Sequence, residues 1–451
     1  MAKAGVGLLG IGNIGKEVFA YLKSSNNAQV TRVARRRINA PAPAAIKKLV
    51  TRRAETVIAD PSVDIVVELT GDGKRGAQYM LDAIDQGQHV VTANKEAIAV
   101  RWRDIMSLAR KRGVSVGFEA TVGGGMPVVR AMQRHNAADD IQSFAGILNG
   151  TCNFILGRMK EYVVRHMDDP NIQKRSLPLE DALAEAQKLG YAEPDPTMDI
   201  NGFDTKFKVA ILANLAFDSY FDPNDIYCEG IWDQNQRILA SDFYFLHHQR
   251  YLGGKYALKL VGVAERTGRR PTLRVHPALI ETDGPLADLA AVEGSFNGLT
   301  VEGRRLGTQF IKGLGAGPKP TTISVASDIH EIAAAVLSSR GTGCHAGPPV
   351  PAARRAGSPG NVDRVQTRGF IRSVSPDVKG VYAKKLDILA RHKVNVQSVV
   401  NVKEFVYGRD RYMPDYIEID PAPDGAVREV LKAFRRLRGV RDPMYFRILE
   451  L

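Results

Sequence analysis

Short apolar runs and longer amphipathic stretches alternate along the first 120 residues. Residues Gly5–Leu9 form an apolar run typical of a buried strand, and Val18, Phe19 and Leu22 then fall on one face of a helix. The alternation continues, with strands expected at Val30–Ala34, Asp64–Leu69, His89–Thr92 and Val114–Phe118 and helices at Gly76–Gln86 and Trp102–Arg112. This alternation of strands and helices predicts an α/β fold that opens with a doubly wound parallel sheet over residues 1–135.

Two further units are expected after residue 135. Residues 136–340 mix strands and helices and predict an α+β domain, with strands at Gln142–Leu148, Leu258–Val263, Thr272–His276 and Phe296–Val301. Residues 341–367 are rich in Gly, Pro and Ala, which predicts a mobile linker. Residues 368–451 follow the βαββαβ order of a ferredoxin-like domain. Its expected elements are strand Gly369–Val374, helix Val381–His392, strands Val396–Val402 and Asp415–Ile419, helix Gly425–Arg438 and strand Met444–Leu449.

Composition excludes several classes of protein. The chain has 451 residues, enough for two or three domains, and no run approaches the roughly 18 apolar residues of a membrane span. The first strand starts at once, so no signal peptide is expected. Cys152, Cys228 and Cys344 have no metal-binding spacing and make no disulfide framework, which fits a cytoplasmic protein. The net charge of +13 is scattered rather than gathered in one long patch, so neither nucleic acid nor membrane is expected as a partner.

A glycine motif follows the first strand directly. Gly10, Gly12 and Gly15, with Asn13 and Ile14 between them, match G-x-G-x-x-G and open the first helix. Glycine at these places allows a tight turn, close approach of the backbone to a pyrophosphate, and helix–strand packing. The helix N-terminus offers free N–H groups to phosphate. Strand, motif and helix together predict a Rossmann-type dinucleotide site.

The second expected strand ends in arginines rather than an acid. An NAD-specific site places Asp or Glu about 20 residues past the glycines to hold the ribose 2′-OH. This chain instead has Arg35, Arg36 and Arg37, and guanidinium groups bind phosphate in a bidentate manner. The sequence therefore favours NADP(H) over NAD(H). The other interpretation is that these are surface arginines of a basic protein.

An acid-rich loop followed by an apolar helix is the most informative stretch for chemistry. Glu193, Asp195 and Asp199 lie in a proline-punctuated loop, and Asp204 and Lys208 follow on a helix. Asp204 and Lys208 are four residues apart and share a face near a buried stripe. Charges so placed are costly unless they pair or bind a polar ligand. A plain ion pair on the helix surface is the alternative. The expected buried stripe is Phe203, Phe207, Ile211, Leu212 and Leu215.

Several motifs resemble those of homoserine dehydrogenases over nearly the whole chain. The most specific segment is LGYAEPDPTMDINGFDTKFKVAILA. The resemblance implies reversible interconversion of L-homoserine and L-aspartate 4-semialdehyde with NAD(P)(H), on the route to threonine, isoleucine and methionine. The other motifs are GLLGIGNIG, DIVVELTG, HVVTANKEAIA, FEATVGGGMPVV, GILNGTCNFIL, LVGVAERTG and LRVHPALI.

The resemblance also implies roles for individual residues. Lys208 corresponds to the residue that transfers the proton, and Asp204 holds the substrate beside it. Glu193 and Asp199 correspond to acids of the substrate site, and Lys95 to a second lysine near nicotinamide and substrate. A lysine is a better base when partly buried or near a second ammonium. Further implied contacts are Asn149, Gly150 and Thr151 for the substrate and Thr70 and Gly71 for the cofactor, with Asp72 as a departure from the family near the nicotinamide ribose.

Two further sites are implied by resemblance. Glu119, with backbone oxygens of Val122, Gly124 and Met126, corresponds to a site for Na⁺ or K⁺, although a structural turn explains the same glycines. The last unit resembles an ACT domain, with Lys379–Gly380 where members usually have Pro-Gly. It is expected either to bind threonine as a feedback effector or to serve only in dimerisation. A homodimer is expected, formed by the middle domain and a helix near Ser327–Leu337.

Two other functions fit parts of the sequence. A phosphorylating semialdehyde dehydrogenase would use Cys152 as its nucleophile, but it needs a base such as His near the thiol, and none follows before His166. A non-catalytic NADP-binding regulator is the second alternative. The presence of the acids and both lysines argues against it.

Overall fold

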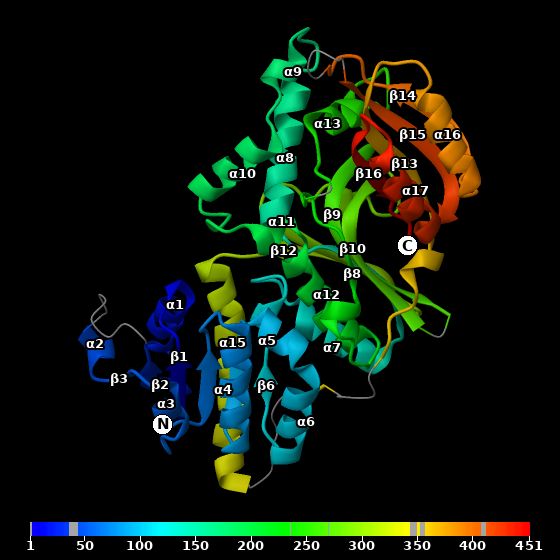
Figure 1. Cartoon of the computed structure of the whole chain (residues 1–451). Helices are drawn as coiled ribbons and strands as arrows, with labels where there is room; N and C mark the ends of the chain where they lie inside the picture. Colours follow the sequence, from blue (N-terminus) through cyan, green and yellow to red (C-terminus); the bar gives the residue numbers. More distant parts are fainter. Residues whose placement is uncertain are drawn as a thin grey trace.

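The molecule is built from two β-sheets joined by a central helix (Figure 1). The computed structural model describes residues 2–35, 44–234, 236–268, 270–342, 350–351, 357–406 and 412–451. Within these ranges, no helix is both long enough and apolar enough to cross a membrane.

The N-terminal sheet has six parallel strands in the order β3-β2-β1-β4-β5-β6. This is the doubly wound order, so the predicted fold class is confirmed. Strand β5 begins and ends where the apolar run predicted, whereas β6 is only two residues long because its ends leave the ladder. The strands are β1 (Ala4–Leu9), β2 (Ala28–Ala34), β3 (Val50–Thr51), β4 (Ile65–Glu68), β5 (His89–Thr92) and β6 (Val116–Gly117).

Helices cover both faces of this sheet, and one of them arrives from far along the chain. Helix α15 (Pro318–Thr342) packs beside α1 (Asn13–Leu22) against β1. Its residues Val325, Ile329 and Ile332 are fully buried there. The C-terminal end of the predicted middle domain, residues 136–340, therefore packs with the parallel sheet. The remaining helices of the unit are α2 (Ala44–Lys47), α3 (Ala54–Ile58), α4 (Gly73–Asp85), α5 (Lys95–Val100) and α6 (Trp102–Arg112).

The second sheet has ten strands and runs through both later units. Nine of them follow the order β12-β11-β7-β9-β10-β16-β13-β15-β14, and β8 pairs with β10. The strands of the middle unit are longer than their apolar runs predicted, because β9 and β10 continue as a twelve-residue antiparallel hairpin. The middle strands are β7 (Ile141–Ile147), β8 (Tyr227–Cys228), β9 (Tyr256–Thr267), β10 (Arg270–Glu281), β11 (Phe296–Gly303) and β12 (Gly307–Leu314).

The C-terminal unit has the predicted βαββαβ order and extends the middle sheet. Strand β10 pairs in parallel with β16, with Ala278 opposite Arg447. Of the expected linker, residues 343–349 and 352–356 lie outside the described residues. The described Gly357 and Gly360 donate backbone hydrogen bonds to Tyr220 and Pro271 of the middle unit. The elements are β13 (Gln366–Pro376), α16 (Val381–Arg391), β14 (Val396–Asn401), β15 (Tyr412–Pro423), α17 (Asp424–Arg436) and β16 (Arg441–Ile448).

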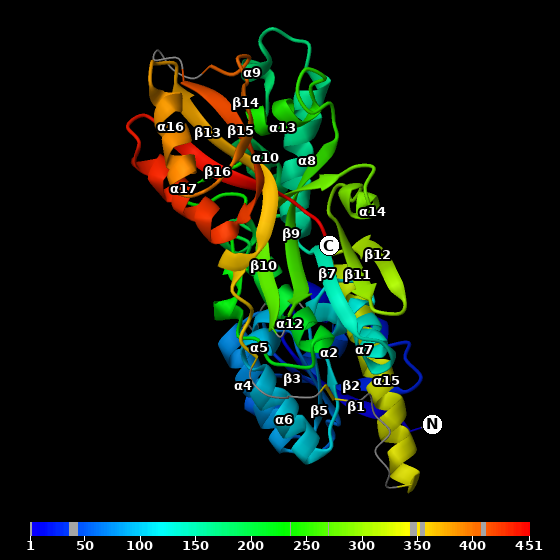
Figure 2. The same cartoon turned by 90° about the vertical axis from the view of Figure 1, so that its right-hand side faces the viewer.

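Helix α12 (Phe203–Ala216) lies between the two sheets, as both views show (Figure 2). It packs against α5 and α7 on one side and β9 and β10 on the other. The predicted one-sided stripe is wrong: Phe203 and Phe207 are only half-buried, whereas Ala210 and Ala213 are fully buried. A helix enclosed on several sides buries most of its circumference.

The other helices of the middle unit pack against α12, against the second sheet or against one another. They are α7 (Val128–Ala138), α8 (Gly150–Arg165), α9 (Ile172–Arg175), α10 (Leu179–Lys188), α11 (Thr197–Ile200), α13 (Ala240–His247) and α14 (Ala287–Ala290).

Candidate functional site

The glycine motif forms the turn between β1 and α1. Gly10 has φ of +102°, and a Cβ there would lie 2.6 Å from the oxygen of Leu69. A Cβ on Gly15 would lie 2.4 Å from the oxygen of Gly10, whereas a Cβ on Gly12 would meet nothing within 4 Å. Gly10 and Gly15 are therefore required by the fold. Gly12 leaves open space at the start of α1, beside Asn13 and Ile14, where the dinucleotide pyrophosphate binds in such folds.

Neighbouring loops meet at the same edge of the sheet, beyond the carboxyl ends of β4 and β5. Buried Glu68 accepts hydrogen bonds from the backbone N–H and hydroxyl of Thr70, at 2.7 and 2.5 Å, and from the hydroxyl of Thr92, at 2.9 Å. It thereby ties together the loops that carry Thr70, Gly71 and Lys95. Glu68 was not among the predicted site residues, although an acid within the apolar run DIVVEL is a visible signal.

Capping interactions fix where Lys95 starts its helix. Asn94 caps α5 by accepting from Ala97 N–H at 3.1 Å, and its amide donates to the oxygen of Asp72 at 3.1 Å. Asp72 in turn caps α4 by accepting from Arg75 N–H at 2.9 Å. The departure noted at Asp72 therefore has a structural role as a helix cap.

Of the three arginines after β2, only Arg35 lies within the described residues. It is half-buried and follows directly on the end of β2, and its backbone N–H donates to the oxygen of Thr51. Arg36 and Arg37 lie outside the described residues. The position of Arg35 is the one from which a side chain meets the ribose in this fold.

The acid and both lysines of the sequence analysis meet in one cluster. Asp204 Oδ2 lies 2.7 Å from Lys208 Nζ, and Asp204 Oδ1 lies 2.6 Å from Lys95 Nζ. Lys208 also donates to the oxygen of Leu148 at 2.6 Å. The side chains of Asp204 and Lys208 are only 6% and 10% exposed, whereas that of Lys95 is 38% exposed. One carboxylate therefore bridges two ammonium groups, and the more open group comes from the nucleotide sheet.

Asn149 adds Asp199 to this cluster. Its amide nitrogen donates to Asp199 Oδ1 at 2.7 Å and to Asp204 Oδ2 at 2.9 Å. Its amide oxygen caps α8 by accepting from Cys152 N–H at 2.7 Å. Asn149 was predicted to lie near the substrate, without a specific role. An Asn directly before a helix was the available signal, because Asn is a preferred N-cap residue.

The remaining expected substrate residues surround the cluster. Glu193 is exposed, and its negative charge acts on Lys95. Thr151 donates through its hydroxyl to the oxygen of Tyr191 at 2.7 Å, which secures the acid-rich loop to α8. A Cβ on Gly150 would lie 2.6 Å from the oxygen of Ser295, so only glycine fits at the first residue of α8.

The charges of the cluster shift one another in consistent directions. Burial disfavours ionisation of Asp204, but Lys208 and Lys95 outweigh burial and hold its pKa well below the ordinary value. The same contact with Asp204 raises the pKa of Lys95. Burial and the charge of Asp204 together raise the pKa of Asp199. Asp204 thus stays ionised in the site. A bound cation would favour the ionised form of Asp199.

Cys152 is not an activated nucleophile. Its side chain is fully buried, and burial raises the pKa of the thiol well above its ordinary value. Its Sγ donates to the oxygen of Asp199 at 3.2 Å. A nucleophilic cysteine needs a thiolate, so the chemistry of a phosphorylating semialdehyde dehydrogenase finds no support in this geometry. Cys344 lies outside the described residues.

The residues expected to bind a monovalent cation already have protein partners. Glu119 is buried and accepts from the backbone N–H groups of Val129 and Arg130, at 2.9 and 3.0 Å. The oxygen of Gly124 accepts from the hydroxyl of Ser324 at 2.6 Å, and that of Met126 from Val128 N–H at 2.9 Å. Among the described residues, no group of three or more His, Cys, Asp or Glu could hold a metal ion.

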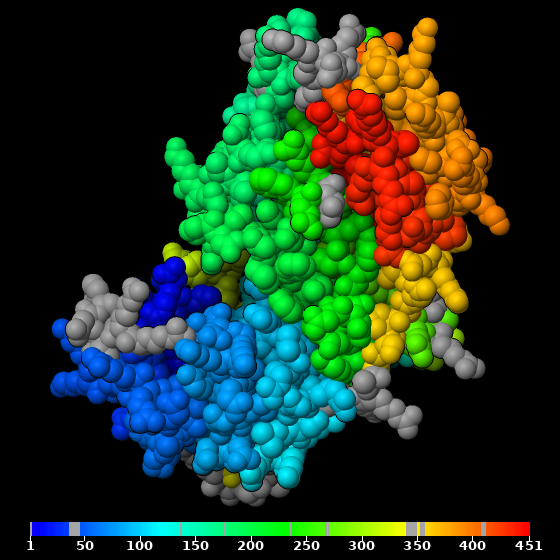
Figure 3. Space-filling model, in the orientation of Figure 1, coloured from blue at the N-terminus to red at the C-terminus, as the bar shows by residue number. Residues whose placement is uncertain are grey.

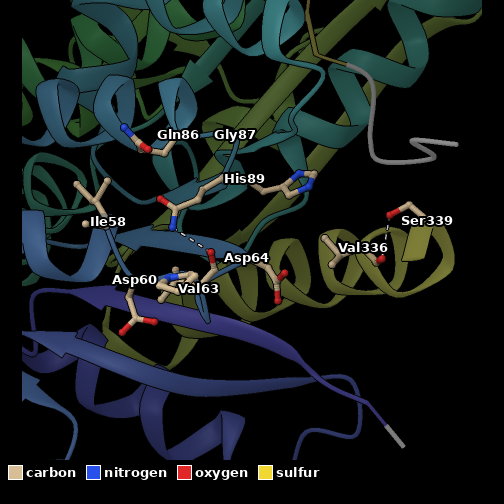
Figure 4. A pocket seen from close by; sticks show the side chains of 12 residues that line it. Ile58, Asp60, Val63, Asp64, Gln86, Gly87, His89, Val336 and Ser339 are labelled. Atoms are coloured by element: carbon tan, nitrogen blue, oxygen red, sulfur yellow. Dashed lines mark hydrogen bonds between the residues drawn. The ribbon is translucent and has the colours of Figure 1, made fainter. Parts of the chain in front are cut away.

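One cavity lies away from this chemistry. It measures about 480 Å³ and is lined by residues at or before the starts of β4 and β5, including Asp60, Asp64 and His89, and by Val336 of α15 (Figure 4). These residues lie at the amino ends of the strands, whereas the cluster lies beyond the carboxyl ends.

The space-filling view shows a recess between the blue N-terminal part and the green middle part (Figure 3).

Comparison with known proteins agrees with the site. The family model described as homoserine dehydrogenase matches residues 127–330, and that of the homoserine dehydrogenase NAD-binding domain matches residues 10–119. A homoserine dehydrogenase of Pseudomonas aeruginosa is 33% identical over 448 residues, covering 97% of each chain.

Solved structures show the same fold. The crystal structure of a homoserine dehydrogenase from Thiobacillus denitrificans superposes with a TM-score of 0.82 and 29% identity, covering 100% of this chain and 99% of that one. A hyperthermophilic archaeal homoserine dehydrogenase in complex with NADPH superposes with a TM-score of 0.59 at 21% identity, covering 75% of this chain and 98% of that one. The nucleotide sheet, the helix between the sheets and the matched models all agree, and the chain belongs to the homoserine dehydrogenases, oxidoreductases of amino-acid biosynthesis.

Proposed function

We propose that Lys208 is the proton-transfer residue of the reversible reaction between L-homoserine and L-aspartate 4-semialdehyde. The observation that carries this role is the buried bridge in which Asp204 contacts Lys208 and Lys95 through different oxygens. An ammonium has three N–H donors. Lys208 uses two of them, on Asp204 and on the oxygen of Leu148. The third has no hydrogen-bond partner among the described residues, so it can reach the substrate oxygen at which the proton is exchanged.

The proton moves between Lys208 and the substrate oxygen in both directions. In reduction, Lys208 donates a hydrogen bond to the aldehyde oxygen and then its proton as the alcohol forms. In oxidation, Lys208 starts as the neutral amine, whose lone pair takes the proton of the hydroxyl group, so that the ammonium forms as the hydride leaves carbon. Lys95 and Asp204 hold the charge around this oxygen fixed, so little reorganisation is needed during the reaction.

The acids around the cluster fit the ammonium group of the amino-acid substrate. Glu193 and Asp199 lie in the loop and on α11 in front of α12, and both carry negative charge toward the cluster. The first turn of α8, beginning at Gly150 and Thr151, offers backbone N–H groups and a positive helix end to the substrate carboxylate. The amino acid would thus be held at both of its charged ends.

The cofactor role falls to residues at the carboxyl edge of the parallel sheet. Gly10, Gly12, Asn13, Ile14 and Gly15 would hold the pyrophosphate. The loop of Thr70 and Gly71 together with Lys95 would face the nicotinamide end. When bound, the nicotinamide supplies the hydride chemistry.

Arg35 supports a preference for NADP(H), because it follows β2 where a 2′-phosphate would lie. The structure of the archaeal neighbour is a complex with NADPH. Arg35→Asp combined with Arg36→Ala should raise the KM for NADPH and leave that for NADH nearly unchanged. An unchanged NADPH KM would remove the arginine argument.

The direct test of function is the absorbance at 340 nm with L-homoserine and either NADP⁺ or NAD⁺. Wild-type protein should reduce NADP⁺ faster. Lys208→Met, which keeps the volume of the side chain without its charge, should lower kcat by roughly three orders of magnitude or more while leaving cofactor affinity intact. Near-normal turnover of that variant would show that another group transfers the proton.

A monovalent cation at Glu119 and the backbone oxygens of Val122, Gly124 and Met126 is a further part of the proposal. The support is a buried carboxylate beside glycine-rich backbone. Activity in tetramethylammonium buffer should rise on addition of K⁺ or Na⁺. Equal activity in all three would leave these residues with a structural role alone.

The C-terminal unit supports a proposal of threonine feedback, with a homodimer as the assembly. Its sheet order β16-β13-β15-β14 is that of a ferredoxin-like unit, and Val378 before α16 is exposed. The apolar residues of the helix near Ser327–Leu337 are buried within the chain, so an interface there would use its remaining face. Threonine should lower activity and raise the Tm. No change in either would leave the unit a structural role.

A further inference from the structure

A buried ion-pair cluster joins the C-terminal unit to the middle unit. Arg447 on β16 donates to both oxygens of Asp424, at 2.8 Å each, and to Glu229 Oε2 at 2.6 Å. Arg447 and Asp424 are each 1% exposed, and Glu229 is 16% exposed. The hydroxyl of Tyr227 donates to Glu229 and accepts from Arg447 at 3.2 Å. Asp424 belongs to the C-terminal unit, so Glu229 and Tyr227 are the cluster's links to the middle unit.

The segment that carries Glu229 packs directly on the turn before α12. Ile231 N–H donates to the oxygen of Ile200 at 2.8 Å, and Cys228 Sγ donates to the oxygen of Asn201 at 3.3 Å. A Cβ on Gly230 would lie 2.1 Å from the oxygen of Ile200. The two backbones are therefore in contact without intervening side chains, and displacement of one requires displacement of the other.

This turn sets the positions of two acids of the site. Asp199 lies on α11, which ends at Ile200, and α12 begins at Phe203, one residue before Asp204. The N–H of Gly202 donates to the oxygen of Asp199 at 3.0 Å, and Gly202 has φ of +81°. A Cβ there would lie 3.1 Å from Cys228 Sγ, so the turn is held from the Glu229 side at this residue too.

We infer that Glu229, held by Arg447, is a positioning residue for Asp199. The C-terminal unit thereby sets substrate affinity through a continuous chain of contacts from β16 to the segment 227–231 and the 199–202 turn. The inference rests on the proposed role of Asp199 in binding the substrate ammonium. It predicts that loosening this contact weakens binding of homoserine, while the cofactor edge of the other sheet is unaffected.

A second ion pair between the same two units supplies a control. Arg250 donates to Glu404 Oε1 at 3.0 Å, and the hydroxyl of Tyr251 donates to Glu404 Oε2 at 2.9 Å. Glu404 is 22% exposed, and its two partners lie in the segment that follows α13, away from residues 227–231 and from the 199–202 turn. Loss of this pair weakens the junction at a place that does not contact Asp199.

The experiment compares Glu229→Gln with Glu404→Gln in the full-length protein. Glu229→Gln should raise the KM for homoserine roughly tenfold, because small displacements of positioning groups have large effects. Its KM for NADP⁺ should stay within about twofold, and kcat should change less than the homoserine KM. Glu404→Gln should lower the Tm but leave the homoserine KM unchanged. Equal KM effects in both variants, or none in Glu229→Gln, would overturn the inference.

Tyr227→Phe provides a milder variant if Glu229→Gln folds poorly. It removes only the hydroxyl between Arg447 and Glu229, and it should raise the homoserine KM in the same direction. In an Asp199→Asn background, Glu229→Gln should add little further, since both act on one contact. Full additivity would also contradict the inference. A wild-type protein inactive on homoserine would instead contradict the proposed function, so the two failures are distinguishable.

Discussion

One residue of the site, Asn149, has two roles: it caps a helix and it donates to two acids. Its oxygen caps α8, and its nitrogen holds Asp199 and Asp204 together. Two carboxylates so close would repel each other without a donor between them. An amide is the side chain that offers both an acceptor and a donor from one planar group. Asn149 therefore connects the start of a helix with the electrostatics of the site.

Replacing Asn149 by Ser separates these two duties. Serine keeps the helix cap, but it removes the donor to both acids. Loss of a hydrogen bond to a charged group costs about 1.5–3 kcal/mol, which should lower kcat/KM for homoserine about 10- to 100-fold with little change in Tm. The control is Asn153→Ser on the same helix, because Asn153 donates to backbone oxygens away from the acids. Wild-type kcat/KM in Asn149→Ser would contradict the assignment.

At the scale of elements, the glycine turn between β1 and α1 shows how one motif serves both fold and ligand. Gly10 and Gly15 are required by close backbone contacts, whereas Gly12 faces open space. The motif alone does not distinguish these duties, because all three positions carry the same residue. Only the neighbouring backbone of Leu69 and the geometry of the turn separate them.

Alanine variants test this distinction. Gly12→Ala should fold normally, because its Cβ meets nothing, but the methyl group would crowd the bound pyrophosphate. An overpacking cost of about 1–3 kcal/mol corresponds to a KM for NADP⁺ raised roughly 5- to 150-fold. Gly15→Ala should lower the Tm, because its Cβ would lie 2.4 Å from the oxygen of Gly10. Thermal melts and cofactor titrations distinguish the two. A Gly12→Ala variant with normal cofactor KM would show that the pyrophosphate does not approach this residue.

At the scale of the whole molecule, a buried lysine outside the site makes the stability of the fold depend on pH. Lys259 on β9 is 5% exposed and donates to the oxygen of Val292 at 2.5 Å and to Asn153 Oδ1 at 3.2 Å. Burial lowers the pKa of Lys259 to about 8; Glu293 opposes this shift and Lys160 adds to it. The unfolded chain, with a lysine pKa of about 10.4, binds more protons between these values. Stability therefore rises with pH across this window.

Lys259→Met should remove this pH dependence. Between about pH 8 and 10.4 the wild-type free energy of unfolding should gain on the order of 3 kcal/mol relative to the variant. Urea unfolding at pH 7.5, 9 and 10.5 measures the difference, and loss of the hydrogen bonds adds only an offset that does not vary with pH. Exposed Lys319→Met is the control and should show no such slope. A constant difference between wild type and Lys259→Met would show that the lysine is not desolvated.

Most elements of both sheets were predicted by apolar periodicity, and the errors have physical causes. Strands β9 and β10 extend beyond their apolar runs because pairing in a long hairpin stabilises polar residues at the ends. Helix α12 is buried on several sides rather than along one stripe, because it lies between two sheets. Helix α15 packs on the parallel sheet, although more than 300 residues separate it from β1 in the chain.

The sequence by itself determined the order of elements, the glycine turn, the helix that carries Asp204 and Lys208, and the family. These depend on residues within one or two turns or on motifs of fixed spacing. The tertiary structure decided which partners meet: Lys95 with Asp204 across 109 positions, Arg447 with Glu229 across 218 positions, and the continuous sheet that joins the C-terminal unit. Such contacts depend on how sheets pack and twist around a shared core, and local periodicity carries no record of that packing.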